Sequence, residues 1–221
     1  MPSTLIAPPS SLPNQDSDYE ALISSLALNG WGMVPEFCPS SLVAQLRTEA
    51  IGLWQAGNFK PAGTGRGNRF ELDDSVRSDW IHWLDPINAS NTQLLYFKQM
   101  EQLRLELNRS LYLGLFDLES HLAVYNPGDH YHRHLDQFQD SNLRILSCIL
   151  YLNENWQNDD GGQLLLYDHW QSPTPCQEFL PTGGNLLCFL SARYPHEVLP
   201  AKRPRFSLTG WYRTRNPLPA G

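Results

Sequence analysis

The chain is 221 residues long, enough for a single domain with one hydrophobic core. Its 23 Asp and Glu residues outnumber its 16 Lys and Arg residues, and the formal net charge is −7. Proteins that bind along a nucleic acid gain affinity from Lys and Arg side chains that neutralise phosphates. We therefore expect no extended nucleic-acid binding by this chain.

Four cysteines are scattered along the chain without a CxxC pair: Cys38, Cys148, Cys176 and Cys188. Cys148 and Cys188 lie in apolar runs, where a reduced cysteine behaves as a small hydrophobic residue. The first residues lack the basic and apolar regions of a secretory signal, and no apolar run reaches the roughly 18 residues of a membrane span. We expect a reduced, cytoplasmic protein that does not cross a membrane.

The first half of the chain is typical of helices. Residues 1–15 are rich in proline and serine, and we expect them to form a mobile tail. Apolar residues then recur at helical spacing in three segments, at about residues 16–29, 40–57 and 92–115. Short strand-like runs lie between the helices, at residues 31–37 and 79–84. A helical support region over residues 16–115 is the prediction.

The second half of the chain is typical of β-structure. After Phe116, short apolar runs alternate with turn sequences such as NPGD, NDDGG and PTGG. These runs cover residues 120–125, 143–152, 162–168, 176–180, 185–190, 196–200 and 205–213. Many short strands separated by turns predict a jelly roll over about residues 116–213.

The segment YNPGDHYHRHLD, residues 125–136, carries side chains suited to binding a metal. Residues two apart on an extended chain point to the same side, so His134 and Asp136 can meet at one ion. His196, at the start of a later predicted strand, is a candidate third ligand. Two imidazoles and a carboxylate form the facial ligand set of non-haem iron(II), which leaves positions open for substrates. An H-x-D triplet alone more often marks ordinary polar residues on a loop.

Arg205 lies nine residues after His196 and begins the predicted strand 205–213. By strand alternation four residues share one face: Arg205, Ser207, Thr209 and Trp211. The turn formers in residues 200–204 predict that this strand returns beside His196. A guanidinium near an iron site is a good receptor for a dicarboxylate, because its paired donors match a carboxylate. An isolated arginine could instead lie at a strand edge, but the joint pattern indicates an iron-dependent oxygenase.

Five segments carry a resemblance to a known family: YNPG…HYHRHLD, LRILSCILYLNENW, GGQLLLYD, NLLCFLSARYPHEVLPA and RFSLTGWY. Together they resemble the catalytic domain of 2-oxoglutarate/iron(II)-dependent dioxygenases of the prolyl 4-hydroxylase family, especially oxygen-sensing prolyl hydroxylases and their bacterial relatives. The similarity runs from about Arg77 to Tyr212. It implies an α+β fold, with a double-stranded β-helix (jelly-roll) core backed by N-terminal helices, in a single catalytic domain over residues 16–221.

The resemblance also implies roles for individual residues. His134, Asp136 and His196 match the iron ligands. Arg205 matches the residue that pairs with the distal carboxylate of 2-oxoglutarate, and Tyr151 matches the phenol that hydrogen-bonds this group, although Tyr151 could also be a core tyrosine. Further residues match positions that line the cosubstrate pocket: Tyr125, Ile149, Val198, Thr209 and Trp211. The implied cofactor and cosubstrates are iron(II), 2-oxoglutarate and dioxygen, with ascorbate as a reductant.

Upstream, the segment RSDWIHW resembles the R-x-D…W strand of the same family. By this likeness Asp79 pairs with Arg144 beside the site, and Arg77, Trp83 and Tyr131 border the substrate. The alternative is a solvated charge cluster with core tryptophans.

Two loops depart from the oxygen-sensing pattern, at residues 73–78 and 137–142. Because these loops contact the peptide substrate in the family, the resemblance does not identify the target protein.

His130 and His132 raise a second possibility for the metal. An HxH pair after a glycine can introduce a cupin site, with His132 and His134 as ligands. Such a site gives no reason for Arg205, so we expect His130 and His132 to be exposed on the loop that enters the metal strand.

The predicted activity is hydroxylation of a prolyl residue in a protein or peptide, coupled to decarboxylation of 2-oxoglutarate to succinate. One alternative is hydroxylation of a free amino acid or another small molecule on the same fold. Another is a binding module without turnover, which the complete ligand set and Arg205 disfavour. The sequence does not indicate the target protein, the hydroxylated carbon, the oxygen affinity or the oligomeric state.

Overall fold

The computed structural model describes residues 15–65, 71–137 and 143–215, with side chains from Tyr19 onward. Its helices are α1 (Gln15–Asn29), α2 (Ser40–Gln55) and α3 (Asn91–Leu111). All three lie where helical periodicity predicts them. Of the segment predicted as a tail, residues 1–14 lie outside the described ranges and Gln15 begins α1.

The ends of α3 follow from local chemistry. Ser90 forms a capping box with Gln93: Ser90 Oγ accepts from the Gln93 backbone N at 3.1 Å, and the Gln93 side chain accepts from the Ser90 backbone N. The helix ends at Leu111 because Tyr112 adopts a left-handed conformation with a φ of 53°. The predicted end near residue 115 is therefore too late.

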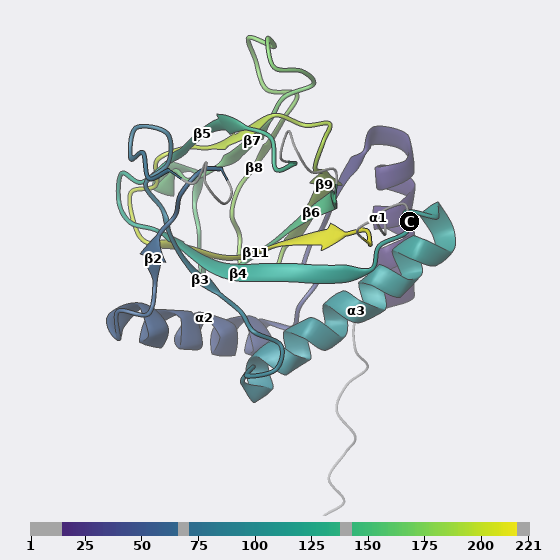
Figure 1. Ribbon diagram of the computed structural model, residues 1–221, viewed down its shortest axis with the longest axis horizontal. Helices are drawn as coiled ribbons and strands as arrows, with labels where there is room; N and C mark the ends of the chain where they lie inside the picture. The colour runs from purple at the N-terminus through teal and green to yellow at the C-terminus, as the bar shows by residue number, and fades with distance from the viewer. Residues whose placement is uncertain (1–14, 66–70, 138–142, 216–221) are drawn as a thin grey trace, which may run out of the picture.

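The strands form two antiparallel sheets (Figure 1). In spatial order, the seven-stranded sheet contains β1 (Trp31–Val34), β9 (Leu186–Leu190), β6 (Arg144–Tyr151), β11 (Arg205–Arg213), β4 (Asp117–Tyr125), β3 (Trp80–Trp83) and β2 (Lys60–Pro61). The four-stranded sheet contains β5 (Tyr131–His134), β10 (His196–Val198), β7 (Leu164–Leu166) and β8 (Gln177–Phe179). A 3₁₀ turn covers Asn158–Asp160. This is the α+β jelly roll that the sequence predicts.

Strand alternation divides the large sheet into two faces. On β6, Leu146, Cys148 and Leu150 pack in the core shared with the helices, whereas Ile149 and Tyr151 pack in the core between the sheets. Figure 1 shows α2 and α3 along the outer face of the large sheet and the small sheet opposite. Because side chains alternate along a strand, odd-numbered residues of β4 and β11, and of β6 from Ser147 onward, point toward the space between the sheets.

The connection from β10 to β11 crosses between the sheets. β10 pairs with β5 and β7, whereas β11 pairs with β4 and β6. Arg205 therefore does not return beside His196 in one sheet, as the turn in residues 200–204 predicts, but begins a strand of the opposite sheet. Among the described helices, none has the length and hydropathy required to cross a bilayer.

Candidate metal centre and cosubstrate cavity

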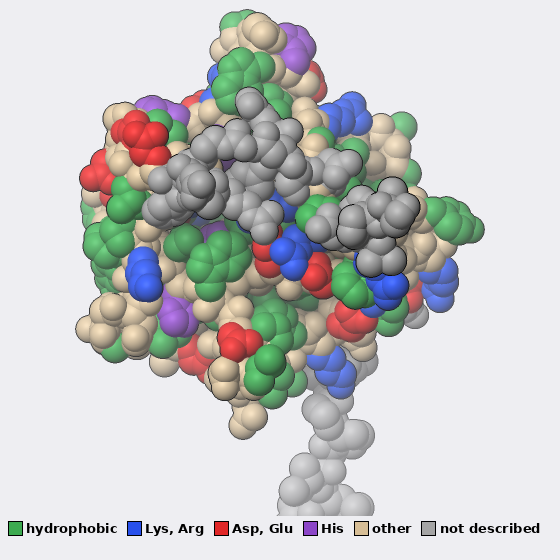
Figure 2. Space-filling model, viewed as in Figure 1, with side chains coloured by type: hydrophobic (Ala, Val, Ile, Leu, Met, Phe, Trp, Pro, Cys, Tyr) green, Lys and Arg blue, Asp and Glu red, His purple; other side chains and the backbone are tan. Residues whose placement is uncertain are grey.

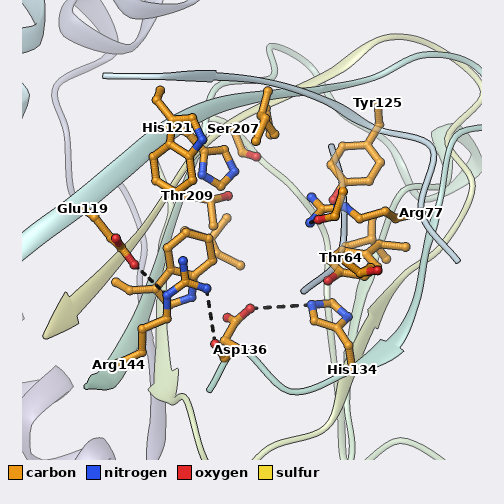
Figure 3. A pocket seen from close by; sticks show the side chains of 18 of the residues that line it. Thr64, Arg77, Glu119, His121, Tyr125, His134, Asp136, Arg144, Ser207 and Thr209 are labelled. Atoms are coloured by element: carbon orange, nitrogen blue, oxygen red, sulfur yellow. Dashed lines mark hydrogen bonds and ion pairs between the residues drawn. The ribbon is translucent and has the colours of Figure 1, made fainter. Parts of the chain in front are cut away.

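A cavity of about 680 Å³ lies between the inner faces of the two sheets (Figure 3). The predicted site residues that line it are His134, Asp136, His196, Arg205, Tyr125, Ile149, Val198, Thr209, Trp211, Arg77, Trp83, Tyr131 and Arg144. Tyr151 and Asp79 are buried but are not part of this lining. The cavity also contains Ser207, so the predicted common face of β11 is confirmed.

Three metal-binding side chains converge in this cavity. His134 Nε2 lies 3.6 Å from Asp136 Oδ1, and His196 Nε2 lies 3.6 Å from Asp136 Oδ2. Donor atoms at such separations can share one ion, since metal–nitrogen and metal–oxygen bonds are about 2.0–2.2 Å long. Within the described ranges, this is the one group of His, Cys, Asp and Glu residues that could hold a metal ion.

The main chain positions the three ligands from two strands. His134 is the last residue of β5 and lies opposite His196, the first residue of β10. Asp136 follows two residues beyond β5. His132, the cupin candidate, lies on β5 rather than on a loop and is exposed to solvent. It is not part of the metal-binding group.

Hydrogen bonds to the main chain set the tautomers of both histidines. His134 Nδ1 lies 2.8 Å from the His132 carbonyl oxygen, and His196 Nδ1 lies 3.1 Å from the Tyr194 carbonyl oxygen. A carbonyl oxygen can only accept, so each Nδ1 carries the proton. The lone pair of each imidazole is then on Nε2, the atom that faces Asp136.

Asp136 is held as a carboxylate. It is buried, and Ser147 Oγ donates a hydrogen bond to Oδ2 at 2.6 Å. Burial alone would raise the pKa of Asp136, but attraction to the protonated forms of His196 and His134 and the hydrogen bond from the Ser147 hydroxyl outweigh it and hold this pKa below its usual range. Ser191 Oγ lies 2.9 Å from Ser147 Oγ and completes the support behind the ligand.

Replacing Ser147 by Ala should lower iron(II) affinity by about 10- to 100-fold, the usual cost of losing a partner of a metal ligand. The backbone of β6 would stay in place, so the loss would come from the orientation of Asp136. Anaerobic iron(II) titration measures the effect. Ser172→Ala, which removes a buried hydroxyl between β7 and β8, is the matched control. Wild-type affinity in Ser147→Ala would contradict this role.

Arg205 is a buried cation without an acidic partner. It is 1% exposed, and its Nε donates to the Gly162 carbonyl at 2.9 Å. A Cβ on Gly162 would lie 3.0 Å from Arg205 Cδ, a tight contact, and the φ of 70° at this position also favours glycine. No carboxylate in the described part of the chain forms an ion pair with Arg205. A buried positive charge is unfavourable unless a negative group pairs with it, so Arg205 is suited to binding an anionic ligand.

Two buried hydroxyls near Arg205 are also without partners. Tyr151 and Ser207 are cross-strand neighbours, and neither hydroxyl has a hydrogen-bond partner among the described residues. The Arg205 guanidinium lies 4.9 Å from the Tyr125 ring centroid and 5.3 Å from the Tyr151 ring centroid. Burial raises the pKa of Tyr151 to about 12 despite Arg205, so this phenol remains a donor. The group therefore fits one end of a dicarboxylate.

Comparison with known proteins agrees with this donor set. The family model of the 2OG-Fe(II) oxygenase superfamily matches residues 120–213, which include His134, Asp136, His196 and Arg205. The fold is similar to the crystal structure of a Pseudomonas putida prolyl-4-hydroxylase, with a TM-score of 0.79 and 41% identity, covering 90% of this chain and 100% of that chain. The chain belongs to the 2OG-Fe(II) oxygenase superfamily.

Two further comparisons are with proteins described as prolyl hydroxylases. A Trichoplax adhaerens prolyl hydroxylase, solved with a hypoxia inducible factor peptide fragment, has a TM-score of 0.78 and 28% identity over 90% of each chain. The Caenorhabditis elegans hypoxia-inducible factor prolyl hydroxylase is 30% identical over 205 residues, which is 87% of this chain and 28% of that protein. The oxygenase spans less than two thirds of the length of the curated relatives it matches.

Arg77 and Asp79 form a buried ion pair beside the cavity of the oxygenase. Arg77 Nε and Nη2 donate to the two oxygens of Asp79, each at 2.8 Å. Arg144 instead bonds Glu119 at 2.7 Å and the Asp136 carbonyl at 3.3 Å. The prediction that Asp79 pairs with Arg144 is wrong. Arg144 begins β6, and Asp79 directly precedes β3. In the order β6-β11-β4-β3, the strands β6 and β3 are three strand spacings apart, or about 14 Å. Arg77, by contrast, precedes Asp79 by only two residues.

This ion pair connects to the metal centre through aromatic stacking. Arg77 Cζ lies 4.0 Å from the Tyr131 ring centroid, and the Tyr131 ring stacks on His134 with centroids 3.4 Å apart and an angle of 11°. Asp79 is 1% exposed, so the alternative of a solvated charge cluster is wrong for this pair. Trp83, 49% exposed at the cavity, is not a core tryptophan either.

His121 is a site residue that the sequence reasoning missed. It is buried on β4 and lines the cavity (Figure 3). Its ring contacts the rings of Trp83 and Trp211. The signal was present, because His121 shares its strand face with Tyr125, four residues later. Burial, together with the Arg77 and Arg144 guanidiniums, lowers the pKa of His121 to about 3.

This pKa predicts an acid-sensitive contribution to folding. An unfolded histidine has a pKa of about 6.5, so folding favours the neutral imidazole. The contribution of His121 is therefore fully present above that value and is lost as the pH falls from about 6.5 toward 3, at up to about 1.4 kcal/mol per pH unit. Denaturant unfolding of the metal-free protein measures this effect. Between pH 6.5 and 5, the free energy of unfolding should fall less steeply with decreasing pH in His121→Leu than in wild type. Equal slopes would contradict it.

Proposed function

We propose that this oxygenase hydroxylates a prolyl residue in a protein or peptide, coupled to decarboxylation of 2-oxoglutarate to succinate. The observation that carries the proposal is the buried, acid-free Arg205 in the same cavity as the two-histidine, one-carboxylate centre. A metal site alone would need no such cation. A dicarboxylate that binds the metal at one end and Arg205 at the other accounts for both features.

The residues have distinct tasks in this reaction. His134, Asp136 and His196 would hold iron(II), and Arg205 with Tyr151 would hold the distal carboxylate of 2-oxoglutarate. When bound, iron(II) supplies the oxidative decarboxylation of 2-oxoglutarate by dioxygen to succinate and carbon dioxide, with the second oxygen atom entering a substrate C–H bond as hydroxyl. The apolar and aromatic lining, from Tyr125, Ile149, Val198 and Trp211, would exclude water.

The prolyl substrate is supported by the relatives. The Pseudomonas putida neighbour is a prolyl-4-hydroxylase, and the Trichoplax adhaerens neighbour is bound to a peptide. In this chain Arg77, Trp83, Tyr131 and Arg144 line the same cavity as the metal centre and would border such a peptide. Asp79 would act on the substrate only through Arg77, since it is buried outside the lining. Of the loop 137–142, whose sequence departs from the family pattern, residues 138–142 lie outside the described ranges.

The charges of the surface suit a protein partner better than a nucleic acid. Figure 2 shows Lys and Arg side chains dispersed among acidic ones, with no continuous basic stripe among the described residues of this face. With a net charge of −7, the potential of the whole chain would favour basic or neutral partners.

We further propose that ascorbate serves as the reductant and that the protein acts in the cytoplasm. All four cysteines are free thiols, which suits a reducing compartment. Prolonged turnover with and without ascorbate tests the first proposal, and cell fractionation tests the second.

The experiment that tests the activity measures succinate formation with proline-containing peptides, cytosolic proteins and free amino acids. Mass spectrometry should then find one added oxygen atom on a proline of a protein or peptide. Brisk hydroxylation of free proline without any modified protein would favour the small-molecule alternative. Succinate formation without any hydroxylated product would contradict both.

A further inference from the structure

His121 has the features of a ligand-binding residue that neither the metal centre nor the Arg205 group uses. It is 4% exposed, its ring lines the cavity, and its buried Nδ1 has no hydrogen-bond partner among the described residues. Leaving a buried polar group without a hydrogen bond is unfavourable. A ligand that hydrogen-bonds this nitrogen would remove that cost.

The strand register places His121 toward the metal side of the cavity floor. Arg205 lies opposite Tyr125, whereas His121 lies opposite Thr209, four residues further along β11. The next inward-facing residue of β11, Trp211, lies opposite Ser147, which bonds the ligand Asp136. Along β11, His121 is therefore nearer than Arg205 to Ser147 and so to the metal ligand Asp136. A dicarboxylate that spans the floor would present its second carboxylate near His121.

The surroundings of His121 favour its neutral form and a small ligand. Burial, together with the Arg77 and Arg144 guanidiniums, keeps the pKa of His121 low, so His121 stays a neutral hydrogen-bonding group. Trp83, which is half exposed, packs against His121 with ring centroids 4.9 Å apart. Because Nδ1 is buried, a small ligand inside the cavity is a better partner for it than a peptide.

We propose that His121 is a positioning residue that donates a hydrogen bond to the metal-side carboxylate of 2-oxoglutarate. This inference rests on the proposed function, because it requires that 2-oxoglutarate binds in the cavity. The donor would be Nδ1–H, with Thr209 and Trp211 on the facing strand. No protonation change of the ring is involved.

The test compares His121→Leu, which keeps an apolar side chain of similar size, with His121→Gln, which keeps a neutral donor. His169→Leu removes an exposed histidine outside the cavity lining and is the control. The constant for 2-oxoglutarate binding to manganese(II)-loaded protein is measured by calorimetry without peptide or turnover. His121→Leu should weaken binding by about tenfold or more, as expected for a hydrogen bond to a charged group. His121→Gln should retain binding within about threefold, and His169→Leu should equal wild type.

Three results would overturn the proposal. In the first, His121→Leu binds 2-oxoglutarate as tightly as wild type. In the second, Leu and Gln weaken binding equally, which indicates a packing role. In the third, only the KM for a peptide changes. A wild-type protein that binds no 2-oxoglutarate would overturn the proposed function as well, whereas a failure to find a prolyl product leaves this binding test intact.

Discussion

Replacing His196 by Ala is expected to lower iron(II) affinity by more than about 100-fold and to abolish succinate formation. The loss of an outer partner of a metal ligand already costs about 10- to 100-fold, and His196 is one of only three candidate ligands in the metal-binding group of the described residues. Its ring is buried, with Nδ1 committed to the Tyr194 carbonyl, so no other nitrogen can take its place. Anaerobic iron(II) titration and succinate release measure the two effects.

His132→Ala is the matched control for this variant. The His132 side chain is exposed, and the contribution of this residue to the metal centre is its backbone carbonyl, which accepts from His134 Nδ1 at 2.8 Å. Alanine keeps that carbonyl, so both iron binding and turnover should remain near wild type. If His132→Ala abolished iron binding while His196→Ala retained it, the metal centre would be of the cupin type.

The sequence predicted the metal centre because its pattern is local and periodic. His134 and Asp136 are two residues apart, and His196 begins a strand bounded by turn formers, so their convergence required only that two strands meet. The common face of β11 followed from alternation in the same way. The ligand positions and the common face of β11 both follow from the alternation of side chains along extended strands, which the local sequence indicates.

The features that the sequence did not predict depend on strand order. The pairing of Asp79 with Arg144 required β3 and β6 to be neighbours, but β11 and β4 lie between them. The position of β11 opposite β10 required knowledge of which sheet each strand joins. His121 was missed for a different reason: although it shares a strand face with Tyr125, a lone histidine in an apolar strand is more often a core residue than a ligand-binding one.

Arg205 is the residue that distinguishes a 2-oxoglutarate-dependent oxygenase from a jelly roll that only binds a metal. The variant Arg205→Lys tests whether it holds 2-oxoglutarate. The guanidinium offers paired, coplanar donors to a carboxylate while its Nε holds the Gly162 carbonyl. A lysine ammonium is a compact charge on a flexible stem, and cannot make both contacts at once. The charge would remain, but the geometry would be lost.

We expect Arg205→Lys to raise the apparent constant for 2-oxoglutarate by about 10- to 100-fold, because a hydrogen bond to a charged group contributes about 1.5–3 kcal/mol and 1.4 kcal/mol is a factor of ten. Tyr151 and Ser207 would still face the carboxylate, so binding should weaken rather than vanish. Iron(II) affinity should barely change, since Arg205 is not a ligand. Titration of 2-oxoglutarate against succinate formation, with anaerobic iron binding in parallel, measures both.

Arg203→Lys is the matched control for Arg205→Lys. Arg203 lies two residues earlier and bonds Asp160 at 2.9 Å and the carbonyls of Glu154 and Asn155, outside the cavity lining. Its replacement should leave the dependence on 2-oxoglutarate unchanged, because surface ion pairs contribute only about 0–1 kcal/mol. A wild-type dependence in Arg205→Lys as well would mean that the buried guanidinium does not hold the cosubstrate. The cavity would then lack its anion receptor, and the argument for 2-oxoglutarate would rest on the metal ligands alone.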